Sequence, residues 1–163
     1  MIRRLLTFFT CCVVLSSCNK ANPSGCGFNE SGIMVPGSEM TSLQAYIAAN
    51  HPTATLHSGG FYYEIVAAGT GTVTPGICSG VTVKYAGYLT SGFKFTTAAE
   101  ENTESTYALG ELIVGWQRGL PLIKAGGTIN LYLPPSLGYG SNAVPGIPAN
   151  SILIFVIQLT AVQ

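Results

Sequence analysis

The sequence has little charge and lacks aspartate altogether. Lys and Arg number 7, Asp and Glu together number 7, and every acidic residue is a glutamate. Charged residues make up only 9% of the 163 residues, and without Arg3 and Arg4 of a leader the remaining chain is slightly acidic. Proteins that bind nucleic acid need a basic face for the phosphates, so we exclude nucleic acid as a partner.

Repeats, heptads and metal-binding motifs are also missing. No repeat of solenoid length occurs. The two histidines, His51 and His57, stand in loop-like sequence without the spacing of metal ligands, so we interpret both as solvated loop residues. We therefore expect no metal and no cofactor. Hydrophobic residues make up 47% of the chain, which is enough for the core of one domain.

The first 17 residues are typical of a signal peptide. Arg3 and Arg4 precede an apolar run, residues 5–15, that is too short to span a bilayer as a stable helix. The sequence LSSC, which ends at Cys18, resembles the bacterial lipoprotein signal, in which the chain is cleaved before the cysteine and its sulfur is lipidated. We expect an exported protein anchored to a bacterial membrane through Cys18, facing the periplasm or the cell surface. The alternative is an ordinary leader with Cys18 incidental.

Cysteine usage predicts one disulfide. If Cys11 and Cys12 leave with the leader and Cys18 is modified, only Cys26 and Cys78 remain. Two remaining thiols in an exported protein favour a bond between them. That bond would tie the N-terminal segment to the strand that leads into the main domain. Two unrelated buried thiols are the alternative.

Residues 18–58 are interpreted as a tether followed by a helical extension. Ser38 is the predicted N-cap, and Leu43, Tyr46 and Ile47 recur at helical spacing. The helix is expected to end near residue 50, because the residue before Pro52 avoids helical angles. Its apolar face should be buried on the outside of the following domain, with a dimer contact as the alternative.

Residues 59–163 predict an α+β domain in which a bent antiparallel sheet wraps around one short helix. Strands are expected over residues 61–69, 79–90, 107–109, 129–133 and 151–162, with a polar bulge over residues 100–105. The short helix is expected over Gln117–Lys124, with Pro121 tolerated in its first turn. The only tryptophan, Trp116, precedes this helix, and strands with aromatic residues flank it in sequence. Such an arrangement favours a dry apolar pocket at Trp116.

Four segments in series carry a resemblance to a known family. They read VKYAGYLTSGFKF, LGELIVGWQRGL, LPPSLGYG and VPGIPANSILIFVIQL. In order and spacing they resemble an FKBP-type peptidyl-prolyl cis-trans isomerase, over about residues 60–163. The resemblance implies an FKBP-like fold and an enzyme that rotates Xaa-Pro bonds in proline-containing polypeptides, assisting the folding of exported proteins. Rotation of this bond requires no nucleophile and no proton transfer, only relief of amide resonance.

The resemblance also implies which residues form the proline pocket. Trp116 would be the floor under the pyrrolidine ring, and Phe95 and Phe155 the walls, with Tyr85 beside them. The Ile113 backbone N–H would hold one substrate carbonyl, and the Tyr139 hydroxyl would donate to another. Further substrate-binding positions are Tyr107 and Leu112 at the rim and Val144 and Ile147 in the flap loop. Taken singly, each aromatic would be assigned to the core.

The chain departs from the family pattern at two positions. Thr96 stands where many active members have an aspartate, and Ser105 stands where an aromatic is common. The first change removes a hydrogen-bond partner near the pocket and the second opens one wall, so we expect weaker activity than in the strongest members. Two alternatives stay open: a proline-binding module or holdase chaperone with little turnover, and a lipid-anchored surface protein that uses the fold as a scaffold.

Overall fold

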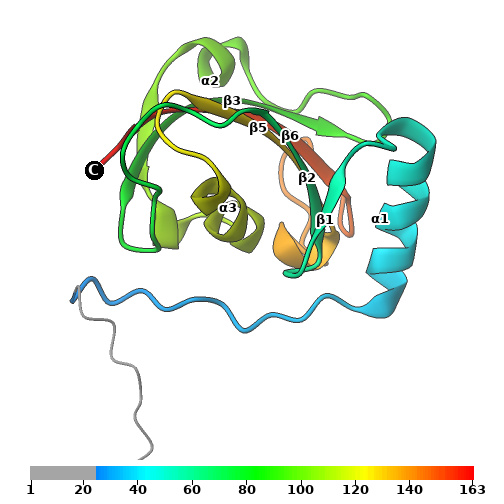
Figure 1. Ribbon diagram of the computed structural model, residues 1–163. Helices are drawn as coiled ribbons and strands as arrows, with labels where there is room; N and C mark the ends of the chain where they lie inside the picture. Colours follow the sequence, from blue (N-terminus) through cyan, green and yellow to red (C-terminus); the bar gives the residue numbers. More distant parts are fainter. Residues whose placement is uncertain (1–24) are drawn as a thin grey trace, which may run out of the picture.

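The computed structural model describes residues 25–163. The predicted signal peptide, residues 1–17, and the predicted lipidation site, Cys18, lie outside this range. The described chain forms a six-stranded sheet that curves around one short helix, and a longer helix lies outside the sheet (Figure 1). The predicted α+β class and the bent antiparallel sheet are confirmed.

The sheet has the strand order β1-β2-β5-β6-β3-β4, and every neighbouring pair is antiparallel. Four of the predicted strands correspond to β2, β3, β5 and β6, and the short one predicted over 107–109 corresponds to β4. Strand β1 comes from the segment interpreted as the extension and adds an edge strand to the sheet. The bounds are β1 Thr55–His57, β2 Phe61–Ala67, β3 Gly80–Leu89, β4 Ser105–Ala108, β5 Gly127–Leu133 and β6 Leu153–Val162.

Alternation along the strands separates an inner and an outer face of the sheet. On the inner face, every second residue of β6 from Leu153 to Leu159 is buried in the main core. Helix α3, Val114–Gly119, packs closely on this face because Gly115 has no side chain: a Cβ there would lie 2.3 Å from Leu133. The close approach fixes Trp116, the next residue, against the sheet.

Helix α3 begins and ends earlier than the predicted range Gln117–Lys124. It ends at Gly119, and a 3-10 turn over Leu120–Leu122 follows. Pro121 lies in this turn rather than in the first turn of the helix. A proline has no N–H for the α-helical bond to the residue four positions earlier, which favours the change to a tighter turn. Trp116 therefore lies within the helix, after its N-cap Ile113.

The interpretation of residues 100–105 as a polar bulge was wrong. Residues Ala98–Asn102 form a short helix, α2, which a capping box at Thr97 and Glu100 begins. The Thr97 hydroxyl accepts from the Glu100 N–H, and the Glu100 carboxylate accepts from the Thr97 N–H. Residues from Ser105 onward belong to β4. A threonine followed three residues later by a glutamate is the signal that could have predicted this helix.

The extension helix α1, Gly37–Asn50, packs on one end of the outer face of the sheet, at β2 and β5 (Figure 1). Leu43 and Ile47 are buried against Tyr62 and Tyr132, and these four residues form a second hydrophobic cluster. The apolar face of the helix thus packs on the outside of the domain, as predicted. Ser38 is not the N-cap: the helix begins at Gly37 after Pro36, and the Ser38 carbonyl accepts from the Ser42 hydroxyl.

Both histidines are half-buried and make specific contacts; His51 lies in the loop after α1, as expected, whereas His57 belongs to β1, so its interpretation as a loop residue was wrong. His51 Nδ1 lies 3.0 Å from the Tyr132 hydroxyl, beside the second cluster. His57 stacks on Phe61 at a ring distance of 4.5 Å, and its Nδ1 accepts from the Gly59 N–H. Burial first, and then the charge of Arg118, lower the pKa of His57.

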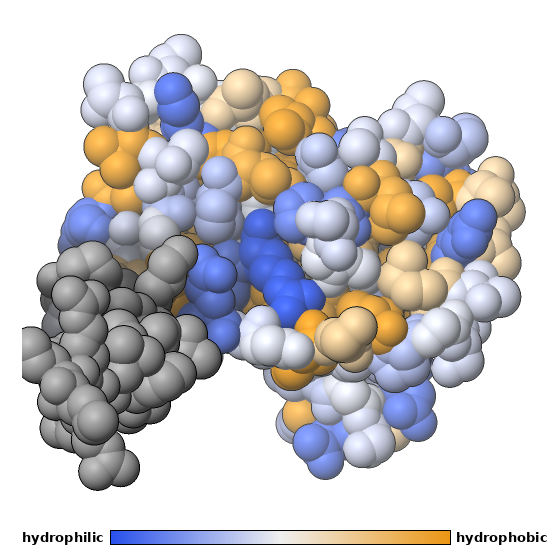
Figure 2. All heavy atoms as spheres, turned by 60° about the horizontal axis from the view of Figure 1, so that its bottom comes forward, coloured by the Kyte–Doolittle hydropathy of each residue, from blue (hydrophilic) through white to orange (hydrophobic). Residues whose placement is uncertain are grey.

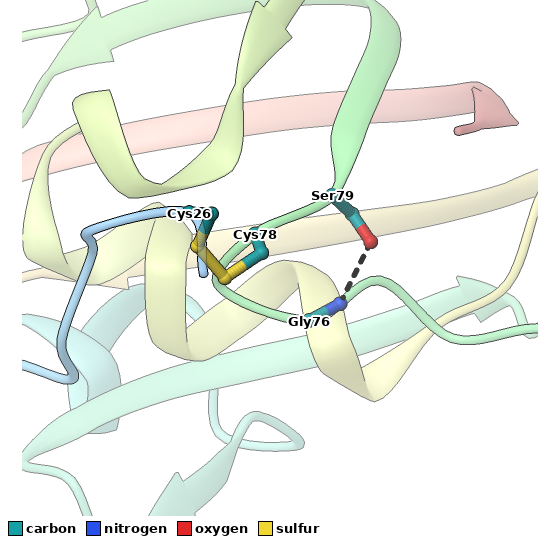
Figure 3. Close-up of a disulfide and its surroundings, with 4 residues drawn as sticks. All are labelled: Cys26, Gly76, Cys78 and Ser79. Atoms are coloured by element: carbon teal, nitrogen blue, oxygen red, sulfur yellow. Dashed lines mark hydrogen bonds between the residues drawn. A yellow bond between two sulfur atoms is a disulfide. The ribbon is translucent and has the colours of Figure 1, made fainter. Parts of the chain in front are cut away.

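Residues 25–36, here called the strap, cross the molecule on the side where α3 lies (Figure 1). A disulfide joins Cys26 to Cys78, with the two Cα atoms 5.8 Å apart, where the chain approaches β3 (Figure 3). The Ser79 hydroxyl accepts from the Gly76 N–H in the same turn. Farther along the strap, the Arg118 guanidinium donates to the carbonyls of Ser31 and Ile33, each at 2.8 Å. A disulfide and a cation thus help to attach the strap, and Val35 also packs against the main core.

The surface of the strap side is mixed in character. Figure 2 shows apolar patches separated by polar residues on this face. Met34 of the strap is 90% exposed, and Leu56 on edge strand β1 is 53% exposed. Within residues 25–163 no helix combines the length and the hydropathy that crossing a bilayer requires.

Candidate active site

Three aromatic rings meet where α3 touches the inner face of the sheet. Trp116 comes from α3, Tyr85 from β3 and Phe155 from β6. The ring centroids of Tyr85 and Trp116 are 5.0 Å apart at 87°, and those of Trp116 and Phe155 are 5.2 Å apart at 90°. Both contacts are edge-to-face, which is a favourable geometry for aromatic pairs. We call these rings, with Phe95, the aromatic cluster.

Phe95 can pack in the cluster because a glycine on β3 leaves room for its ring. Its ring lies edge-to-face with Phe155 at 5.6 Å. A Cβ on Gly87 would lie 2.3 Å from Phe95 and 3.1 Å from Phe155, so only glycine admits both rings at this position. The backbone fixes the same contact, because the Phe95 N–H donates to the Gly87 carbonyl at 3.0 Å. This close approach explains the glycine of the Tyr85-Ala86-Gly87 pattern.

Burial is graded across the cluster. Trp116 and Phe155 are only 4% and 3% exposed and form its base. Tyr85 and Phe95 are half-buried and form its sides. Among the described residues, the buried Trp116 Nε1–H has no hydrogen-bond partner. The base of the cluster is therefore apolar with a single unpaired donor.

Ile113 lies at the N-cap of α3, beside Trp116. Its carbonyl accepts from the N–H groups of Trp116 and Gln117, while its own N–H donates to no acceptor within residues 25–163. The Gln117 side chain holds the preceding turn by donating to the carbonyls of Gly110 and Leu112. The amide expected to hold a substrate carbonyl is thus unpaired and lies in a fixed turn.

The remaining predicted residues surround the cluster on loops and on β4. Tyr139 is 38% exposed, and burial first, then the Glu100 carboxylate, raise the pKa of its hydroxyl. Val144 and Ile147 exchange backbone hydrogen bonds of 3.0 and 2.9 Å that close the flap loop, and a Cβ on Gly146 would lie 3.5 Å from Phe95. Tyr107, Leu112 and Val144 are half-buried against the main core, whereas Ile147 belongs to it and is 5% exposed.

The described residues include no group of three or more His, Cys or Glu side chains that could hold a metal ion. The groups that meet at the site are apolar rings, amide N–H groups and hydroxyls. Such groups can exclude water and donate hydrogen bonds. They suit a reaction that moves no proton at neutral pH.

Comparison with known proteins agrees with this geometry. The model of the FKBP-type peptidyl-prolyl cis-trans isomerase family matches residues 71–160, which contain all ten predicted site residues. The chain belongs to the FKBP-type peptidyl-prolyl cis-trans isomerase family.

Curated relatives of this family member include two proteins named FkpA. The chain is 43% identical over 106 residues to FkpA of Buchnera aphidicola subsp. Schizaphis graminum, which covers 65% of this chain and 42% of that protein. It is 41% identical over 106 residues to FkpA of Escherichia coli strain K12, covering 65% of this chain and 39% of that protein. It is also 36% identical over 122 residues to the outer membrane protein MIP of Legionella longbeachae, covering 73% of this chain and 52% of that protein. The chain thus spans about half, or less, of the length of these relatives.

Two solved structures share the fold. The crystal structure of FkpA from Escherichia coli aligns with a TM-score of 0.68 and 35% identity, covering 77% of this chain and 60% of that one. A peptidyl-prolyl cis-trans isomerase from Pseudomonas syringae pv. tomato aligns with a TM-score of 0.66 and 25% identity, covering 81% of this chain and 99% of that one.

The two departures from the FKBP pattern have different structural outcomes. The Thr96 hydroxyl accepts from the Gly87 N–H at 2.9 Å and so supports the Phe95 side of the aromatic cluster. Ser105 pairs with Val83 at the start of β4. A carboxylate nevertheless lies beside the pocket, from a different position in the chain: the Tyr85 hydroxyl donates to Glu100 Oε1 at 2.8 Å. The sequence analysis missed Glu100, since it assigned this segment to a polar bulge.

Proposed function

We propose that this chain is a peptidyl-prolyl cis-trans isomerase that acts on Xaa-Pro bonds in proline-containing polypeptides. The observation that carries the proposal is the convergence of Tyr85, Phe95 and Phe155 on Trp116 in a member of the FKBP family. The aromatic cluster would seat the proline ring, with Tyr107, Leu112, Val144 and Ile147 contacting the residues around it.

The physical mechanism is relief of amide resonance in a dry site. The barrier to rotation of a peptide bond is about 20 kcal/mol, because the C–N bond has partial double-bond character. An apolar seat removes water from the amide, which favours the less polar twisted form over the planar one. The unpaired Ile113 N–H and the Tyr139 hydroxyl would each donate to a substrate carbonyl and hold the chain on both sides of the rotating bond.

This mechanism predicts a rate that is nearly independent of pH between about 6 and 8, since no side chain of the proposed site titrates there. Burial first, and then hydrogen bonding to Glu100, raise the pKa of Tyr85, and the pKa of Tyr139 is also raised, so both hydroxyls stay protonated. The two histidines belong to the outer cluster and to the strap side, away from the aromatic cluster. A bell-shaped profile would contradict the mechanism.

The test is exchange spectroscopy by NMR on a short Xaa-Pro peptide, with protein that begins after Cys18. We expect accelerated cis-trans exchange, lost in Trp116→Ala and reduced in Tyr139→Phe, which alters an exposed group and leaves the core intact. Tyr46→Phe on α1 is the matched control, because the Tyr46 hydroxyl faces His51 on the outer side. Peptide binding without accelerated exchange would instead establish a proline-binding or holdase module, and neither binding nor exchange would establish a scaffold.

We further propose that the protein is exported and lipid-anchored through Cys18, with residues 1–17 as the leader, 18–58 as tether and extension, and 59–163 as the isomerase domain. The Cys26–Cys78 disulfide supports an oxidising compartment, and one relative is named an outer membrane protein. Mass spectrometry of the mature protein tests the anchor. We expect a diacylglyceryl cysteine at the N-terminus, which Cys18→Ser should abolish.

A further inference from the structure

The Tyr85 side of the aromatic cluster is held by a carboxylate from α2. The Tyr85 hydroxyl donates to Glu100 Oε1 at 2.8 Å. The ring of the same tyrosine contacts Trp116, with the two ring centroids 5.0 Å apart. The other carboxylate oxygen, Glu100 Oε2, accepts from the Thr97 N–H at 2.7 Å and from the Thr97 hydroxyl at 2.9 Å. Both oxygens are thus engaged, so the carboxylate cannot turn without breaking a charge-assisted hydrogen bond.

We propose that Glu100 is a positioning residue for the isomerisation, which fixes the Tyr85 ring against Trp116 and so sets one side of the proline seat. This inference rests on the proposed function. Glu100 need not touch the substrate, because its effect passes through the Tyr85 hydroxyl. The short helix α2 then has a role in the site: its capping box holds the carboxylate at the required place.

The position after Phe95 does not perform this task in the structure. The Thr96 hydroxyl accepts from the Gly87 N–H, which supports the opposite side of the cluster. The Tyr85 side is therefore supported by Glu100 and the Phe95 side by Thr96. The family pattern places a single aspartate at the position of Thr96, whereas here Thr96 and Glu100 each support one side of the cluster.

The charged and titratable groups around Tyr85 agree with this division. Glu100 is the carboxylate that faces its hydroxyl, and Tyr107 on β4 also acts on its pKa. The neighbouring Glu101 is paired with Lys94 instead, so it is not the group that holds Tyr85. Burial first, and then the charge of Glu100, raise the pKa of Tyr139 as well.

The test is a double-mutant cycle on kcat/KM with Tyr85→Phe and Glu100→Ala. A hydrogen bond to a charged group contributes about 1.5–3 kcal/mol, so loss of the positioning contact should lower kcat/KM by roughly tenfold or more. If Glu100 acts through the Tyr85 hydroxyl, the double variant is no slower than Tyr85→Phe alone. Additive losses, or an unchanged rate in Glu100→Ala, would overturn the proposal.

Two matched variants separate positioning from folding. Glu100→Gln keeps one acceptor oxygen, which can serve either the Tyr85 hydroxyl or the Thr97 N–H, so its kcat/KM should lie between that of Glu100→Ala and that of the wild type. Glu101→Gln changes a glutamate of the same helix that contacts Lys94, and it should leave kcat/KM unchanged. A loss in Glu101→Gln equal to that in Glu100→Ala would assign the effect to folding of α2 and overturn the inference.

An NMR readout distinguishes failure of this inference from failure of the proposed function. The chain has one tryptophan, so the Trp116 Nε1–H gives a single indole signal that reports the Tyr85 ring beside it. Glu100→Ala should shift that signal in the same direction as Tyr85→Phe, whether or not peptide exchange occurs. An unshifted signal in Glu100→Ala overturns the positioning role, whereas absence of exchange in the wild type overturns the isomerase proposal.

Discussion

The two faces of the sheet carry the same pair of chemical groups in different surroundings. On the inner face the Tyr85 hydroxyl donates to Glu100 at 2.8 Å, and on the outer face the Tyr132 hydroxyl donates to Glu64 at 2.6 Å. Burial first, and the carboxylate next, raise the pKa of both tyrosines. The tyrosine–glutamate hydrogen bond by itself therefore does not distinguish the role of the inner pair from that of the outer pair.

The residues around each tyrosine–glutamate pair distinguish the two roles. Glu64 also accepts from Thr53 at 2.8 Å and from Asn130 at 3.3 Å, and Tyr132 is 1% exposed beneath α1. This outer pair joins β2, β5 and the end of the extension. Glu100 takes its other bonds from the turn of its own five-residue helix, and Tyr85 borders the aromatic cluster. We infer that the outer pair stabilises the fold, while the inner pair orients a side chain of the site.

Removal of the disulfide, which attaches the extension to the domain, should give the largest effect. It should lower the stability of the fold without changing the site. Cys26 and Cys78 are separated by 52 residues. On the chain-entropy model, closing such a loop stabilises by about 4 kcal/mol. We expect the variant with Cys26→Ser and Cys78→Ser to lose free energy of unfolding in urea on this scale, with isomerase activity per folded molecule retained. A reducing agent should destabilise the wild type and leave the double variant unchanged.

Leu43→Ala should give the next largest effect, again on stability alone. Leu43 is fully buried in the cluster between α1 and the outer face. Truncation of a buried leucine costs about 2–5 kcal/mol, from lost burial and from the cavity left behind. Leu56→Ala is the matched control, because Leu56 is 53% exposed and its truncation should change urea stability little. A fall in kcat/KM on Leu43→Ala at a temperature where the protein is folded would mean that the two faces are coupled.

One contact makes this outcome informative. The Glu39 carboxylate of α1 accepts from the Ser136 N–H at 2.9 Å, in the loop that leads to Tyr139. Coupling through α1 would therefore act on the Tyr139 side of the site. Retained activity would show that the loop holds its conformation when the outer cluster is weakened.

The sequence predicts the fold and the aromatic cluster better than it predicts the polar contacts. The resemblance to the family, through the order of its motifs, implied the residues of the cluster. Arg118 could not be predicted as the attachment of the strap, because backbone carbonyls such as those of Ser31 and Ile33 leave no residue-specific signal. The Tyr132–Glu64 pair depends on the register of β2 against β5, which the pattern of apolar residues alone does not specify.

A pair of matched hydroxyl deletions should give opposite results on the two faces. Tyr132→Phe removes a hydroxyl from a side chain that is 1% exposed and takes one hydrogen bond from Glu64, so we expect a loss of about 1–3 kcal/mol of stability with activity unchanged. Tyr85→Phe should lower kcat/KM and change stability less, because Tyr85 is only half-buried whereas Tyr132 is fully buried. Urea unfolding and peptide exchange, measured on both variants, test this. Equal losses of activity would contradict the division of roles between the faces.

The smallest effects should appear in the pH dependence of stability, in two windows. Burial first, then Arg118, lower the pKa of His57 in the folded state, so the unfolded chain takes up a proton first as the pH falls below about 6.5. Stability should decline from that pH until the lower pKa of the folded state is reached. The wild type should therefore lose stability between neutral and mildly acidic pH, and His57→Gln should remove this decline.

The more acidic pH range is the one in which Glu64 and Glu100 take up protons. It tests directly whether the two tyrosine–glutamate pairs have different roles. The Tyr132 hydroxyl lowers the pKa of Glu64, and the Thr97 amide followed by the Tyr85 hydroxyl lowers that of Glu100. A depressed carboxyl pKa stabilises the fold above the unfolded value of about 4.3, and this stability is lost as the pH falls through the folded pKa. The urea concentration at the unfolding midpoint should thus decrease as the pH falls below about 4.3. Both Glu64→Gln and Glu100→Gln should make this decrease smaller. Over the same range only protonation of Glu100 should shift the Trp116 indole signal, since only Glu100 holds a ring that touches Trp116. An indole shift that survives in Glu100→Gln but disappears in Glu64→Gln would reverse the roles assigned to the two faces.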